Sequence, residues 1–198
     1  MSTDDTTDPT GTDPTSYEVR HGVLGAGPSR SAVFTRTYDA PVADVWDACT
    51  TAERLRRWYA PVEGDLRVGG TFTQGDFGVG TVTRCEAPHL LTVELGGGSP
   101  ATDQIELRLR EVDGGTVLEL EHATTLDTHE IGGQVYDAVY CMGGGYGPRL
   151  QTLQEHLDGT LSPDLDPSTL HTLEAYGPPI QRAMAQLDQL LTADASRA

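Results

Sequence analysis

The amino-acid sequence predicts an α+β fold in which an antiparallel sheet packs against one long helix. Residues 64–126 contain several runs in which apolar and polar side chains alternate, separated by residues that favour turns. A single apolar stripe with helical spacing follows, between Val135 and Leu157. A series of strands followed by one long helix is typical of a two-layer α+β domain.

The N-terminal residues divide into a polar tail and two candidate strands. Residues 1–16 are almost entirely Ser, Thr, Asp, Pro and Gly, so they can bury too little apolar surface to offset their ordering entropy. We therefore expect a disordered acidic tail whose deletion leaves stability unchanged. Residues 17–24 fit a short strand, residues 25–30 fit a turn, and residues 31–38 fit a strand with two different faces.

Two short helices are predicted directly after this strand. Pro41 suits the first turn of a helix, where its missing N–H is not needed. An apolar stripe at helical spacing follows, formed by Val42, Val45, Trp46 and Cys49. Thr50 and Glu53 have the spacing of a capping box, which predicts that the second helix begins near Thr50.

The clearest hairpin lies near the end of the strand region, around a tight turn at Asp113-Gly114-Gly115. The residues that share one face are Ile105, Leu107 and Leu109 before the turn, and Leu118, Leu120 and His122 after it. Charged residues alternate with them. This pattern predicts a sheet with one dry face, covered by a helix, and one wet face.

The covering helix is expected at residues 135–158. Its first half contains Gly143, Gly144, Gly145, Gly147 and Pro148, which predict a kink, a close packing contact or a delayed start. Residues 161–198 are expected to form a linker and a helical C-terminal extension. The apolar residues of that extension are predicted to dock on the domain: Ile180, Met184, Leu187, Leu190 and Leu191.

Composition limits the range of functions. The net charge is −17, and all thirteen basic residues are arginine. This negative field should repel nucleic acids and anionic membrane surfaces, whether the acidity reflects salt adaptation or GC-rich coding bias. The chain has no apolar run of about 18 residues, the length of a membrane span. Its N-terminal residues also lack the features of a secretory signal, so a cytoplasmic location is expected.

Six motifs follow one another in a fixed order: the strand-Ala-Pro-x-x-x-Val-Trp entry at 34–46, Leu55-Arg56-Arg57-Trp58, Gly69-Gly70-Thr71-Phe72, the segment 80–90, the strand 116–124 and the Gly-aromatic pair at 145–146. Together they resemble the SRPBCC (START-like, helix-grip) superfamily, and within it the branch related to the activator of the ninety-kilodalton heat-shock-protein ATPase. The resemblance covers roughly residues 31–159.

The resemblance implies a helix-grip fold: a curved antiparallel sheet wrapped around a long C-terminal helix, with two short helices after the first strand and a pocket in between. The domain would span residues 17–160. Two positions depart from the family pattern, because Tyr146 stands where Trp is frequent and Pro148 lies inside the helix.

Seven residues are nominated for the wall of this pocket: Trp58, Phe72, Leu107, Leu120, His122, Met142 and Tyr146. Alternation directs Leu107, Leu120 and His122 inward, and helical spacing places Met142 and Tyr146 on the facing stripe. Trp58 and Phe72 are added as aromatic residues that follow the second short helix and the Gly69-Gly70 pair. His122 is the polar member, and an imidazole in an apolar pocket could act as a general acid or base. The alternative is that these side chains form an ordinary core, with His122 hydrogen-bonded inside it.

Three classes of function remain open. The first is a protein that binds a small apolar molecule, with no metal or cofactor. The second is a cyclase- or dehydratase-like enzyme acting on an aromatic or polyketide-like substrate. The third is a chaperone-linked protein-interaction module, with a protein partner or a homodimer. The chain contains none of the common nucleophile-elbow, zinc-protease or phosphate-loop motifs.

Overall fold

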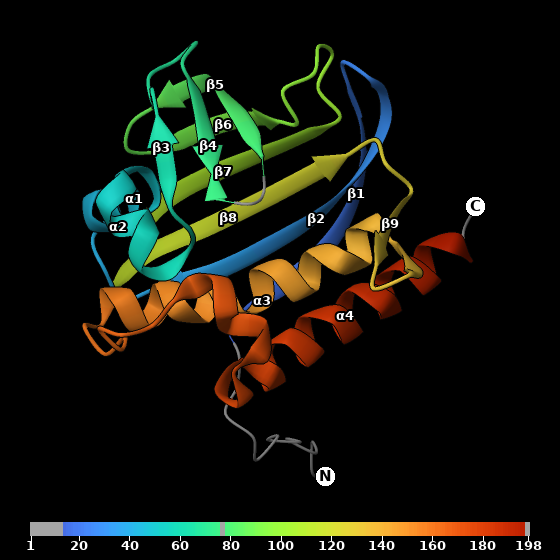
Figure 1. The fold of residues 1–198 in the computed structure, drawn as a ribbon. Coiled ribbons are helices and arrows are strands. Elements are labelled where there is room, and N and C mark those ends of the chain that lie inside the picture. Colours follow the sequence, from blue (N-terminus) through green and yellow to red (C-terminus); the bar gives the residue numbers. More distant parts are fainter. Residues whose placement is uncertain (1–13, 76–77, 197–198) are drawn as a thin grey trace, which may run out of the picture.

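The computed structural model describes residues 14–75 and 78–196, and its main feature is an antiparallel sheet that curves around a long helix (Figure 1). The helix is α3 (Ala138–Leu157). The sheet has eight strands in the order β1-β2-β8-β7-β6-β5-β4-β3. Their bounds are β1 (Ser16–Leu24), β2 (Gly27–Tyr38), β3 (Val62–Gly64), β4 (Thr71–Gln74), β5 (Val79–Glu86), β6 (Leu90–Leu95), β7 (Asp103–Val112) and β8 (Gly115–Thr124). The predicted helix-grip fold is confirmed.

The N-terminal strands form a longer hairpin than the sequence predicts. β2 begins at Gly27, not near Ser31, and Ser16 at the start of β1 already pairs with Thr35. Residues 1–13 of the predicted disordered tail, residues 1–16, lie outside the described residues. Its last residue, Ser16, belongs to the sheet. The two short helices, α1 (Val42–Thr50) and α2 (Ala52–Trp58), follow the second strand, not the first.

The predicted capping box at the start of α2 is wrong. Thr51 precedes the helix, and its side chain makes no capping hydrogen bond. Its hydroxyl instead donates to the Asp47 carboxylate at 2.7 Å, and the Thr50 hydroxyl donates to the Trp46 carbonyl at 2.8 Å. Both threonines thus bond back to α1, since the two helices are separated by a single residue.

The β7–β8 hairpin has the predicted register and the predicted dry face. Leu107 lies opposite Leu120, and Leu109 lies opposite Leu118. These four side chains are buried under α3 together with Phe34 and Leu150. The outer face carries ion pairs, in which Arg20 and Arg108 each contact Glu119.

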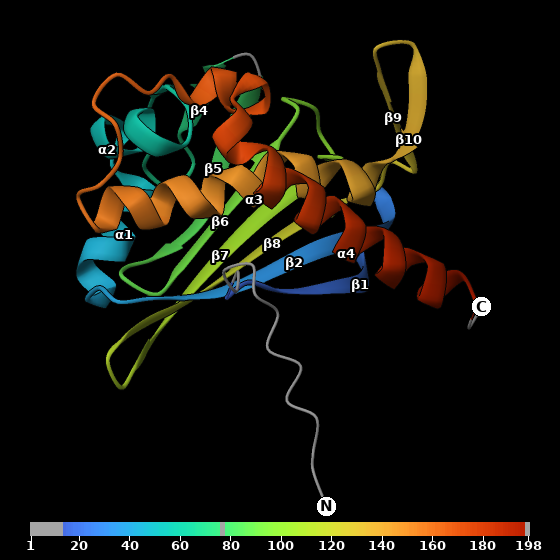
Figure 2. The ribbon, with the colours of Figure 1, turned by 90° about the horizontal axis from the view of Figure 1, so that it is seen from below.

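The long helix begins three residues later than the sequence predicts. Residues 128–137 form a separate hairpin of β9 (Thr128–Ile131) and β10 (Gln134–Asp137), which projects from the body in Figure 2. Val135 therefore does not start the apolar stripe, and 66% of its surface is exposed. Asp137 caps α3 by accepting hydrogen bonds from the N–H groups of Val139 and Tyr140. The helix then runs through Pro148 without a break.

The C-terminal extension docks on the domain. After two 3₁₀ turns, η2 (Pro167–Thr172) and η3 (Glu174–Tyr176), helix α4 (Gly177–Ala195) packs along α3 and against β1 (Figure 2). Leu187 is fully buried, as the docking prediction requires, and so is Ala183. A Cβ on Gly143 would come within 2.9 Å of the Ala183 backbone, so this glycine permits the close contact of the two helices.

Among residues 14–75 and 78–196, no helix is long and apolar enough to cross a membrane.

Candidate functional site

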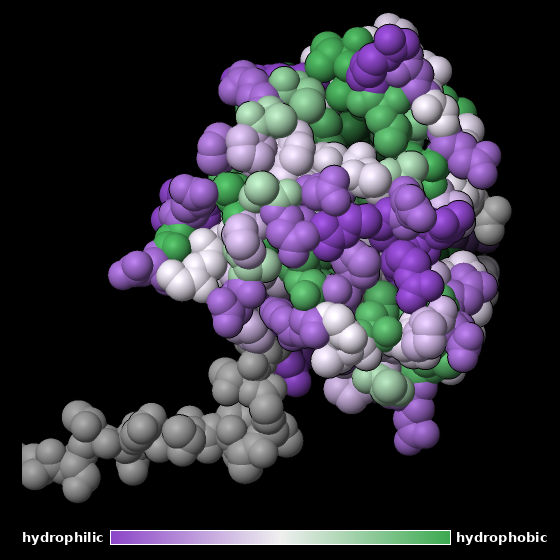
Figure 3. Space-filling view, turned by 90° about the vertical axis from the view of Figure 1, so that its left-hand side faces the viewer, coloured by the Kyte–Doolittle hydropathy of each residue, from purple (hydrophilic) through white to green (hydrophobic). Residues whose placement is uncertain are grey.

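A cavity of about 340 Å³ lies between the inner face of the sheet, the two short helices and α3. Most of its wall is apolar, and its aliphatic members include Leu55, Leu66, Val82, Leu91, Val93, Ile105, Leu118 and Leu153. In Figure 3, hydrophobic side chains gather around a hollow in the upper part of the face, at the height of β3 to β5. Those strands supply Val62, Phe72 and Val82 to the cavity wall.

Five of the seven nominated residues line this cavity. They are Trp58, Phe72, Leu107, Leu120 and Tyr146, which come from α2, β4, β7, β8 and α3. The Trp58 ring is nearly buried, at 5% exposure, and its indole N–H donates to the Ala48 carbonyl at 2.9 Å. This hydrogen bond between α2 and α1 fixes the ring in the cavity wall.

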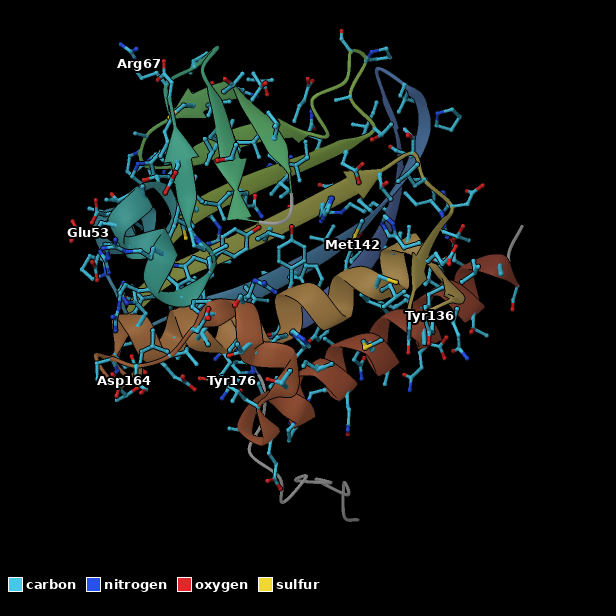
Figure 4. The ribbon with its side chains drawn as sticks, in the orientation of Figure 1. Glu53, Arg67, Tyr136, Met142, Asp164 and Tyr176 are labelled. Atoms are coloured by element: carbon cyan, nitrogen blue, oxygen red, sulfur yellow. The ribbon has the colours of Figure 1, made fainter. Side chains whose placement is uncertain are left out.

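Met142 and His122 do not line the cavity. Met142 lies on α3, one turn before Tyr146 (Figure 4), and is buried in the main hydrophobic cluster. His122 lies behind Tyr146, with its Nδ1 atom 3.1 Å from the Tyr146 hydroxyl. The sequence thus predicted the correct face of β8 for His122, but the structure places its side chain behind Tyr146 and not in the cavity wall.

Polar side chains gather at one part of the wall: Tyr59, Gln74, Tyr146 and Arg149. The Gln74 amide donates to the Tyr59 hydroxyl at 2.6 Å. The Arg149 guanidinium lies 5.5 Å from the centre of the Tyr59 ring and donates to the Gly145 carbonyl at 2.7 Å. We refer to these four residues as the polar end of the cavity.

The two tyrosines of the polar end remain neutral at ordinary pH. Burial raises the pKa of the Tyr59 hydroxyl, although Arg149 and the hydrogen-bonding contacts with Gln74 and Tyr146 partly oppose this change. Burial also raises the pKa of Tyr146 well above its usual value, and Tyr59 adds to the effect. Both groups are therefore neutral hydroxyls and not phenolates.

A carboxylate completes the chain of polar groups behind Tyr146. Asp103 Oδ1 lies 3.3 Å from His122 Nε2, and both side chains are only 16% exposed. Burial alone would raise the Asp103 pKa, but the polar contacts with His122, Thr102 and Thr124 outweigh it and lower the pKa. Asp103, His122 and Tyr146 thus form a continuous chain from the sheet to the cavity wall.

The sequence pattern missed three of these polar residues, although a local signal marks each one. Asp103 precedes Ile105 by two positions, so it shares the inner face of β7 with Ile105 and Leu107. Gln74 stands in the same relation to Phe72 on β4. Arg149 follows Tyr146 by three residues on α3.

The structure offers little support for a cysteine nucleophile or a metal site at the cavity. Cys49 lines the wall, but burial raises the pKa of its thiol to about 12, so it stays a protonated and weakly nucleophilic group. In the part of the chain that the structure describes, no group of three or more His, Cys, Asp and Glu side chains could hold a metal ion.

Comparisons with known proteins agree with the fold. Residues 39–158, more than half of the chain, match the model of the family described as "Activator of Hsp90 ATPase homolog 1-like protein". No curated protein matches the chain.

Solved structures with the same fold include CalU16 from Micromonospora echinospora. Its crystal structure is 33% identical, covers 89% of this chain and 97% of its own, and has a TM-score of 0.71. Its solution structure gives 31% identity, coverage of 93% and 98%, and a TM-score of 0.73. DynU16, a protein in the dynemicin biosynthetic locus, is 21% identical, with coverage of 65% and 47% and a TM-score of 0.52, and shares the fold alone.

The family match covers residues 39–158, and all residues of the cavity wall lie within that range. The chain therefore belongs to the family of Activator of Hsp90 ATPase homolog 1-like proteins.

Proposed function

We propose that this protein binds a small, mainly apolar molecule in the cavity between the sheet and α3. The observation that carries the proposal is the cavity itself, whose volume of about 340 Å³ is within the range of small-molecule sites. Its wall is largely apolar, and the polar end offers a few fixed hydrogen-bonding groups. Such a combination gives affinity through burial and orientation through the polar contacts.

Native mass spectrometry of freshly purified protein tests this proposal, because a tightly held molecule should appear as an added mass.

A direct test adds 1-aminoanthracene, an apolar fluorophore, to the wild-type protein and to the Leu91→Trp variant. Leu91 lines the cavity, so the larger indole should fill it and weaken binding at least about tenfold, or 1.4 kcal/mol. Leu90→Trp is the matched control, since neighbouring residues of a strand point to opposite faces. Equal binding by both variants would contradict the proposal.

An enzyme that carries out acid–base chemistry on the bound molecule is the second candidate. The observation that favours it is the convergence of Tyr59, Gln74, Tyr146 and Arg149 on one part of an apolar cavity. A co-purified molecule would be incubated with the wild-type protein and with His122→Gln. A change in the molecule's mass or proton pattern that requires His122 would support catalysis, and an unchanged molecule would support binding alone.

The hypothesis that this protein binds another protein is supported by the family description alone. That description does not identify a binding surface. DynU16 shares the fold and comes from a biosynthetic locus, so biosynthetic intermediates are reasonable molecules to include in the binding experiments.

A further inference from the structure

The polar groups at and behind the cavity wall form one connected chain. Gln74 donates to the Tyr59 hydroxyl, which leaves the proton of that hydroxyl available to another acceptor. The Tyr146 hydroxyl is close to both Tyr59 and His122 Nδ1. His122 Nε2 faces the Asp103 carboxylate. The chain therefore runs from the cavity through Tyr146 and His122 to a buried negative charge.

The charge of Asp103 determines which way protons are arranged along this chain. A carboxylate beside one imidazole nitrogen favours the tautomer with the proton on that nitrogen. We therefore assign the proton to His122 Nε2, the atom that faces Asp103, which leaves Nδ1 as an acceptor for the Tyr146 O–H. In this arrangement the chain can take up a proton from the cavity side, because His122 can receive one at Nδ1 while Asp103 stabilises the resulting positive charge.

We propose that the polar end of the cavity binds the hydroxyl group of a phenolic ligand and that the chain of Tyr146, His122 and Asp103 accepts its proton. The inference rests on the proposed function, since it names the class of molecule for the same cavity. It also gives a role to Asp103 and His122, which do not touch the cavity.

The proton transfer is balanced without any further reactant. The O–H bond of the ligand breaks and its proton passes to the Tyr146 oxygen. The original Tyr146 proton passes at the same time to His122 Nδ1. The products are a bound phenolate and an imidazolium paired with Asp103, so the total charge of the complex is unchanged. Tyr146 ends the step as a neutral hydroxyl, in agreement with its burial.

The surroundings favour a phenol over other hydroxyl compounds. The aromatic rings of Trp58 and Phe72 in the cavity wall suit a flat, apolar ring system. Arg149 supplies the positive charge and Tyr59 and Gln74 supply the N–H and O–H donors that a phenolate oxygen needs. An aliphatic alcohol holds its proton too tightly for an imidazole to remove, whereas a carboxylic acid is already ionised near neutral pH.

The experiment uses 4-nitrophenol, whose phenolate absorbs visible light while the neutral form does not. The absorbance of the bound probe is followed as pH is varied, and its ionisation midpoint is compared with that of the free probe. We expect the wild-type protein to lower the midpoint. His122→Gln, Tyr146→Phe and Asp103→Asn should each raise it again by about one pH unit or more, which is at least a tenfold change in the ionisation equilibrium.

Tyr176→Phe is the matched control. Tyr176 is also a buried tyrosine with a hydrogen-bonded hydroxyl, but its partner is Glu155 and it lies outside the cavity wall (Figure 4). The midpoint in this variant should equal that of the wild-type protein. Tyr146→Phe and Asp103→Asn are nearly isosteric, and His122→Gln keeps a polar side chain of similar size. If one of the three fails to fold, the other two still measure the same transfer.

The possible outcomes separate the inference from the proposed function. If 1-aminoanthracene binds and 4-nitrophenol either fails to bind or binds with the midpoint of the free probe, the phenol proposal is overturned while the cavity remains a ligand site. A lowered midpoint that persists in all folded test variants would also overturn the proposed proton transfer through Tyr146, His122 and Asp103. If neither probe binds, the proposed function itself fails.

Discussion

Asp103 is the last of the polar groups that lead from Tyr146 through His122, behind the cavity wall. It is a largely buried carboxylate at the start of β7, and its neighbours are His122, Thr102 and Thr124. The Thr102 hydroxyl donates to one carboxylate oxygen at 2.7 Å, and His122 faces the other at 3.3 Å. Such contacts favour the charged form of a carboxylate in a position where burial would otherwise disfavour it.

The lowered pKa of Asp103 has a consequence for stability. A carboxyl group whose pKa is lower in the folded state stabilises the protein above its ordinary pKa of about 3.9, and this contribution is lost as the pH falls through the folded-state pKa. Asp103→Asn should therefore reduce the free energy of unfolding at neutral pH and make it fall less steeply on acidification. Chemical denaturation at a series of pH values measures both effects.

Asp113→Asn is the control for this prediction, because Asp113 is exposed in the β7–β8 turn. Its acid profile should run parallel to that of the wild-type protein. If Asp103→Asn also ran parallel, the carboxylate would have no special interaction with His122.

At the scale of residues, the apolar wall was easier to predict from the sequence than its polar groups. Leu107 and Leu120 follow from period-two alternation, and the structure places them opposite each other. Asp103 could not be linked to His122 in this way, because their contact depends on the register of β7 against β8. Ile105 pairs with His122, so Asp103 becomes its diagonal neighbour on the same face.

At the scale of elements, helix α3 shows how glycines set the distance between helices. A Cβ on Gly147 would lie 2.7 Å from the Pro179 carbonyl oxygen of α4, and one on Gly143 would meet the Ala183 backbone. Gly145 has open space around its Cβ position. The predicted close packing contact in the first half of the helix is therefore confirmed for two of its glycines.

These glycines give matched substitutions within one helix. Gly143→Ala and Gly147→Ala should destabilise the protein by about 1 to 3 kcal/mol, because the added methyl group forces the two backbones apart. Gly145→Ala should instead stabilise it by up to about 1 kcal/mol, through the higher helix propensity of alanine. Thermal or chemical unfolding would measure the difference. A loss of stability in all three variants would show that the contact with α4 is not the cause.

The start of α3 shows where element boundaries could not be predicted from local patterns. Val135 has the correct spacing for the helical stripe, yet it lies in β10, opposite Glu130. The β9–β10 hairpin and the Asp137 cap determine the helix start, and neither changes the apolar period. The same applies to Thr50 and Thr51, whose side chains bond to the preceding helix.

At the scale of the whole molecule, the C-terminal helix is part of the structure that supports α3. Removal of residues 177–198 should lower the melting temperature by several degrees, since Ala183 and Leu187 are fully buried against the domain. Removal of residues 1–13, which precede β1, serves as the comparison and should leave the melting temperature unchanged. Equal melting temperatures for the full chain and the shortened C-terminus would contradict the role of α4.

The binding of a small molecule inside the cavity can be tested directly through the two tryptophans of the chain. Trp46 and Trp58 both line the cavity wall. In a nitrogen–proton correlation spectrum of the labelled protein, the two indole N–H signals should move when 1-aminoanthracene is added, and they should stay in place in the Leu91→Trp variant, apart from the signal of the new indole. Binding that shifts only surface signals, such as those of the β9–β10 hairpin, and leaves both indole signals unchanged would contradict the claim.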